Sequence, residues 1–66
     1  MGNTRRAYYD MCDTVAAARK NMDAAHAEFD AATEERKAEL WEAMEETERE
    51  YYLAKNHMEK LRARLG

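Results

Sequence analysis

The fold is decided by the octet DAATEERK, residues 30–37, which separates two apolar stripes. Before the octet, apolar residues recur every seven positions from Tyr8 to Phe29, and a second series follows three residues later. After it, the same spacing runs from Leu40 to Leu65, shifted by one residue relative to the first stripe. Apolar residues spaced three and four apart are typical of an amphipathic helix. The sequence therefore predicts an all-α chain.

Two architectures are compatible with the shift between the stripes. In the first, residues 1–66 form a single domain, a hairpin with helices at about 4–31 and 34–65, a turn at about 30–35, and Thr33 capping the second helix. In the second, one helix about 90 Å long runs through the octet and pairs as a coiled-coil dimer. Equal stripe lengths and the polar octet favour the antiparallel hairpin, whereas its helix-forming Ala, Glu, Arg and Lys favour the continuous helix.

The apolar stripe is the predicted core and oligomer surface in either architecture. Two helices share only one seam, which buries part of each apolar face. Chains of this length are marginally stable alone, and a single cysteine excludes an intrachain disulfide. We therefore expect a homodimer, most simply a four-helix bundle. The stripe residues are Tyr8, Met11, Val15, Met22, Phe29, Leu40, Met44, Tyr51, Met58 and Leu61.

Charge is distributed unevenly along the chain. The net charge is −3, but residues 1–20 carry a net +2, residues 21–50 a net −8, and residues 51–66 a net +3. Direct nucleic-acid binding requires a concentrated basic face, which this pattern does not provide. Apolar runs are too short for a membrane span, no secretory signal pattern is present, and the lone cysteine suits a reducing compartment. The expected location is the cytoplasm.

Residues with chemical potential do not assemble into a catalytic or metal site at the level of sequence. His26 lies three residues after Asp23, which begins a carboxylate–imidazole pair, but di-iron bundles need two such motifs and two further carboxylates. Cys12 has no base close by in the sequence, and adjacent glutamates on a helix diverge by about 100°. We expect no catalytic residue, no metal and no cofactor. His26 is predicted to lie at the edge of the core.

Large apolar residues outside the stripe are the main functional signal. Tyr9, Trp41, Tyr52 and Leu53 lie about 110° to 150° from its centre, with Tyr52 and Leu53 on opposite sides. Exposed aromatic side chains often anchor protein interfaces. An alternative is that the buried face is wide, as in a four-helix bundle. Both interpretations imply contact with another chain.

These patterns predict a non-enzymatic protein–protein interaction module. Its expected action is to bind and modulate, most simply inhibit, a target protein that the sequence does not identify. In size and composition it is comparable with small regulatory proteins of bacteria and bacteriophages, by analogy of type alone. One alternative is a self-assembling coiled-coil scaffold. Another is an acidic mimic of nucleic acid, with Glu42, Glu45 and Glu46 presented to a nucleic-acid-binding protein.

Overall fold

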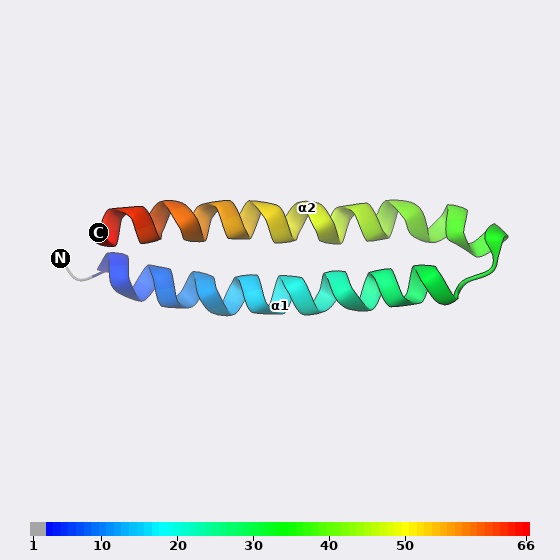
Figure 1. Ribbon diagram of the computed structural model, residues 1–66, viewed down its shortest axis with the longest axis horizontal. Coiled ribbons are helices and arrows are strands. Elements are labelled where there is room, and N and C mark those ends of the chain that lie inside the picture. Colours follow the sequence, from blue (N-terminus) through cyan, green and yellow to red (C-terminus); the bar gives the residue numbers. More distant parts are fainter. Residues whose placement is uncertain (1–2) are drawn as a thin grey trace.

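The computed structural model describes residues 3–66 as two antiparallel helices, α1 (Asn3–Ala31) and α2 (Glu34–Leu65), joined by a short turn (Figure 1). Both described chain ends lie at one end of the rod and the turn at the other. The principal-axis extents are 52 × 14 × 13 Å. The predicted all-α hairpin is therefore confirmed, and the continuous helix of about 90 Å is wrong.

The turn is made by a helix cap, without glycine or proline. The Ala32 N–H donates to the carbonyl oxygen of Phe29 at 3.1 Å, which closes the end of α1. Thr33 is extended (φ −68°, ψ 163°), and its hydroxyl accepts a long hydrogen bond of 3.4 Å from the Arg36 N–H. Its carbonyl accepts from the Lys37 N–H at 2.8 Å. Thr33 thus satisfies the Arg36 N–H, a donor that the start of α2 would otherwise leave free, and its carbonyl accepts the first hydrogen bond of the helix.

The two helices differ in how well their own sequences support them. α2 begins with Glu34 and Glu35 and has Arg62 and Arg64 in its last turn, so charges at both ends favour the helix dipole. Gly66 follows with a φ of 112°, a conformation that suits glycine at a helix C-terminus. α1 has no acidic residue in its first turn and no basic residue in its last. The stability of α1 therefore depends more heavily on packing against α2.

The core is a narrow seam. Only Met44, Ala54 and Leu61 are buried among the described residues, and all three belong to α2. Ala18, Ala25 and Ala32 alternate with larger residues along the α1 stripe. These small side chains let the two helix axes approach, which helps to bury Met44, Ala54 and Leu61. Leu65, at the same heptad position as Met44, is 42% exposed because it ends α2, where the seam stops. Stripe residues that remain half-buried are Tyr8, Met11, Val15, Met22, Phe29, Leu40, Tyr51 and Met58.

The exposed surface is large for the mass of the chain. A compact monomer of 7.7 kDa would expose roughly 4,300 Å². The hairpin exposes 5389 Å², an excess of roughly 1,000 Å² over that expectation. Much of the stripe is still accessible to water in the isolated hairpin, as the half-buried class of its residues shows.

The cap at Thr33 provides a first test. Thr33→Ala should lower the free energy of unfolding by about 1 kcal/mol, because a donor at the start of α2 loses its acceptor. Urea unfolding at fixed protein concentration measures the change. Thr14→Ala is the matched control, since the Thr14 hydroxyl is exposed and donates only to the Asp10 carbonyl of its own helix. Equal effects of the two substitutions would contradict a capping role for Thr33.

Candidate protein interface

The four residues predicted to bind a partner are exposed in the hairpin. The accessible fractions are 60% for Tyr9, 48% for Trp41, 56% for Tyr52 and 63% for Leu53. With Leu65, these are the exposed large apolar side chains of the described chain. Their positions around the helices decide whether they form one surface or two.

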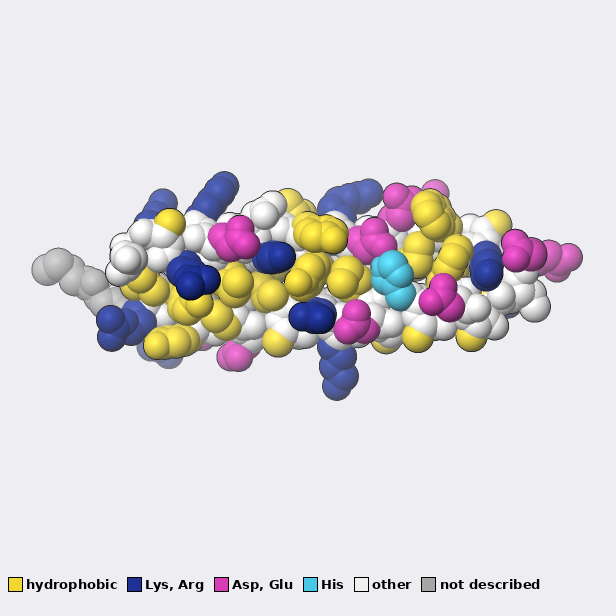
Figure 2. All heavy atoms as spheres, viewed as in Figure 1, with side chains coloured by type: hydrophobic (Ala, Val, Ile, Leu, Met, Phe, Trp, Pro, Cys, Tyr) yellow, Lys and Arg dark blue, Asp and Glu magenta, His cyan; other side chains and the backbone are white. Residues whose placement is uncertain are grey.

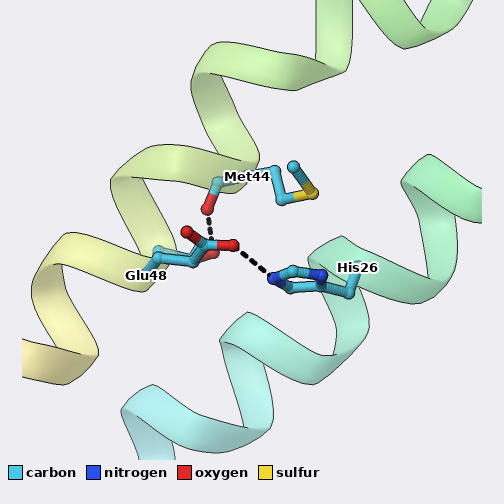
Figure 3. Close-up of polar contacts among 4 residues, drawn as sticks. His26, Met44 and Glu48 are labelled. Atoms are coloured by element: carbon cyan, nitrogen blue, oxygen red, sulfur yellow. Dashed lines mark hydrogen bonds and ion pairs between the residues drawn. The ribbon is translucent and has the colours of Figure 1, made fainter.

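A contact between the helices identifies the two sides of the seam. His26 of α1 and Glu48 of α2 reach toward each other, with 2.6 Å between the imidazole Nε2 and the carboxylate Oε1 (Figure 3). Trp41 precedes Glu48 by one heptad and Tyr52 follows it by one turn, so both lie on the Glu48 side of α2. Leu53 is a further 100° around the helix and faces the opposite side.

Tyr9 joins the same side as Trp41 and Tyr52. It follows the stripe residue Tyr8 as Tyr52 follows Tyr51, and equivalent heptad positions flank the same edge of an antiparallel helix pair. The side of the seam that carries Tyr9, Trp41, Tyr52 and the His26–Glu48 contact is called here the aromatic edge. In Figure 2, apolar side chains follow the line between the helices, and a histidine lies between the helices in the half nearer the turn.

The contact of His26 with Glu48 differs from the pairing considered from sequence spacing. The Asp23 carboxylate lies 4.0 Å from Arg19 Nε on its own helix, while His26 reaches across the seam. The His26–Glu48 contact is an ion pair whenever the imidazole is protonated. Within residues 3–66 no three His, Cys, Asp or Glu side chains are grouped closely enough to hold a metal ion.

Near the turn, Trp41 is held in place by the core. Its ring centroid lies 5.6 Å from that of Phe29, with the planes tilted by 58°. The Lys37 ammonium lies 5.6 Å from the Phe29 centroid, within the range of a cation–π contact. The Trp41 ring therefore contacts the stripe at Phe29 and is still 48% exposed to water. A fixed aromatic side chain loses little conformational entropy when a partner covers it.

Tyr8, Tyr9 and the Cys12 thiol lie toward the terminal end of the rod, and Tyr51 and Tyr52 lie close to the middle of α2. The rings of Tyr8 and Tyr9 are 5.7 Å apart, and those of Tyr51 and Tyr52 are 5.3 Å apart. A hydrogen bond with the Cys12 thiol, followed by the thiol's charge and by desolvation, raises the pKa of Tyr8 above 10.0, while the Arg62 guanidinium partly opposes this. Cys12 is a free, half-buried thiol.

A shallow hollow on α2 adjoins the aromatic edge at Glu45, which lies one turn after Trp41. It is lined by Glu42, Glu45, Glu46 and Arg49, all from α2. Three carboxylates and one guanidinium on the surface of one helix make an open, acidic surface. Its three glutamates are the residues predicted from the sequence to form the acidic surface of a nucleic-acid mimic.

Comparison of the sequence with protein-family models, curated proteins and solved structures finds no match. Neither α1 nor α2, the helices of residues 3–66, has the length and apolar character needed to cross a bilayer. The evidence for the candidate interface is the position and exposure of Tyr9, Trp41, Tyr52 and Leu53 in the hairpin.

The His26–Glu48 contact is testable by a double-mutant cycle. His26→Ala, Glu48→Ala and the double variant should give a coupling energy of about 0.5 kcal/mol, because the pair is only partly shielded from solvent. The matched control is the Arg19–Asp23 pair, which is longer and more exposed, and whose coupling should be close to zero. Urea unfolding measures both cycles. A His26–Glu48 coupling no larger than that of the control would rule out the contact.

Proposed function

We propose that this chain is a non-enzymatic protein–protein interaction module that binds a target protein through the aromatic edge and modulates, most simply inhibits, its activity. The observation that carries the proposal is the alignment of Tyr9, Trp41 and Tyr52 along one side of a seam that is itself half-exposed. Tryptophan and tyrosine are the residues most enriched among interface hot spots, together with arginine. Leu53 lies on the other side and provides a smaller, separate contact.

The shape of this surface favours an elongated partner. The rod is 52 Å long and 14 Å or less across, so the aromatic edge is a strip running along it. A target presenting an amphipathic helix could place its apolar face over the half-buried stripe residues, as in helix-in-groove recognition. A module of this size acts on a target by covering part of its surface or by holding one of its conformations.

Self-assembly is the second candidate function, and the opposite charge of the two halves of the rod supports it. The net +2 of residues 1–20 and the net +3 of residues 51–66 come together at one end of the hairpin, and the net −8 of residues 21–50 lies at the other. Copies of this chain could assemble into a scaffold with the basic end of one copy against the acidic end of the next. The acidic mimic instead depends on the outer face of α2, at Glu42, Glu45 and Glu46.

Site-specific photo-cross-linking tests the proposed function. A photoreactive residue at Tyr9 or Tyr52, in the cells that naturally contain the protein, should link it to a specific target. The matched control is Asn21, which is exposed and lies one residue before the stripe residue Met22, on the side of the seam opposite the aromatic edge. Tyr52→Ala should then weaken binding of the purified target about tenfold or more, and Asn21→Ala should leave it unchanged.

Two results would contradict the proposal. Cross-links from Asn21 alone would move the contact off the aromatic edge. Loss of binding on charge reversal at Glu42, Glu45 and Glu46, with Tyr52→Ala harmless and affinity falling steeply with salt, would instead support the acidic mimic.

A further inference from the structure

The aromatic edge changes sign along its length. Lys55 and Arg62 follow Glu48 at seven-residue intervals, so they continue the same line on α2 toward the chain ends. Asp30 and Glu45 flank the edge in the half nearer the turn, one residue after the stripe residues Phe29 and Met44. In Figure 2 the end of the rod at the turn carries mainly Asp and Glu side chains, whereas Lys and Arg side chains are more frequent at the terminal end and in the middle. Glu59, Lys37 and Arg19, which precedes His26 by seven residues, are exceptions that weaken the polarity without reversing it.

Oppositely charged side chains lie at matching distances from the centre of the rod, on opposite sides of it. The midpoint of α1 is residue 17, and that of α2 falls between residues 49 and 50. At about 1.5 Å per residue, Lys55 lies about 8 Å from the α2 midpoint on the terminal side, and Glu45 about 7 Å on the turn side. Arg62 lies about 19 Å away on the terminal side, and Asp30 about 19 Å from the α1 midpoint on the turn side.

The aromatic residues also lie at matching distances from the midpoints of their helices. Tyr9 lies about 12 Å from the midpoint of α1 on the terminal side, and Trp41 about 13 Å from that of α2 on the turn side. Tyr52 lies only about 4 Å from the midpoint. A two-fold axis through the centre of the edge would place Tyr9 of one copy near Trp41 of the other. The same axis would place the two copies of Tyr52 beside each other.

We infer that the aromatic edge binds a second copy of this chain in an antiparallel arrangement, with the basic terminal half of each copy on the acidic turn half of the other. The inference rests on the proposed function, since it names an occupant for the same contact surface. A parallel arrangement would place like charges together, and like charges facing each other across an interface disfavour it. Two hairpins joined in this way form a four-helix bundle with a closed, isologous interface.

The exposed area is of the size that such an interface needs. A standard interface buries about 800 Å² on each partner. The hairpin exposes 5389 Å², roughly 1,000 Å² more than a compact monomer of its mass. A second copy on the aromatic edge would cover most of this excess and shield the half-buried stripe. The target and the second copy would then compete for one surface.

Charge-reversed variants test the arrangement. Sedimentation equilibrium should show the wild-type chain as a dimer at micromolar concentration, with twice the 7.7 kDa mass of one chain. One variant carries Lys55→Glu and Arg62→Glu, and the other Asp30→Lys and Glu45→Lys. Each alone should self-associate at least tenfold more weakly, and an equimolar mixture should recover a heterodimer. Circular dichroism of each variant verifies that the helices are retained.

Cysteine cross-linking tests which edge is used. In a Cys12→Ser background, Tyr52→Cys should form a disulfide-linked dimer at least ten times faster than Leu53→Cys. The two positions are adjacent and similarly exposed, but lie on opposite sides of the seam, so Leu53→Cys is the matched control. Equal cross-linking rates, or a wild-type chain that is monomeric at 100 micromolar, would overturn the inference.

The two proposals fail in different ways. A monomer that still cross-links to a target from Tyr9 would refute the antiparallel dimer and leave the proposed function standing. A dimer that cross-links only to itself from Tyr9 and Tyr52 would support the antiparallel dimer and refute target binding at this edge.

Discussion

Two helices can bury only one line of contact, and this constraint governs the whole structure. α1 and α2 each present an apolar stripe, yet only three residues of α2 leave the solvent in the hairpin. The remaining stripe residues are half-buried, because each helix covers only the middle of the other's apolar face. The free energy from burial, at about 25 cal/mol per Å² of apolar surface, is correspondingly small for a chain that must order more than sixty residues. Contact with a further polypeptide is the direct way to increase it.

The features around the seam are consistent with that need. Trp41 packs against Phe29 and is still 48% exposed, so it touches the stripe and is also accessible to a partner. The hairpin turn brings the basic ends of the sequence together and leaves the acidic middle at the opposite end, which gives the rod a polarity that no single helix would have. The turn at Thr33 therefore has a second consequence: it decides which charges lie together as well as how the helices pack.

Much of the fold could be predicted from local patterns. The one-residue shift between the stripes and the sequence Thr33-Glu34-Glu35 indicated a turn, and the structure has Thr33 as the cap of α2. Exposure of Tyr9 and Tyr52 followed from their angle to the stripe. What could not be predicted depends on the stagger between the helices. Asp23 was the natural partner of His26 by spacing, but Glu48 is its actual partner, and this pairing requires knowing which turn of α2 lies beside which turn of α1. The packing of Trp41 on Phe29 depends on the same stagger.

The central claim is that this hairpin is completed by a second polypeptide, and for a self-associating chain the thermal unfolding midpoint measures this directly. If the folded state is a dimer, Tm rises with protein concentration, because mass action favours the associated form. With an unfolding enthalpy of about 0.7 kcal/mol per residue, a hundredfold increase in concentration should raise Tm by roughly 10 °C. A cooperative transition whose Tm stays constant from 5 to 500 micromolar would show a self-sufficient monomer, and it would contradict this account.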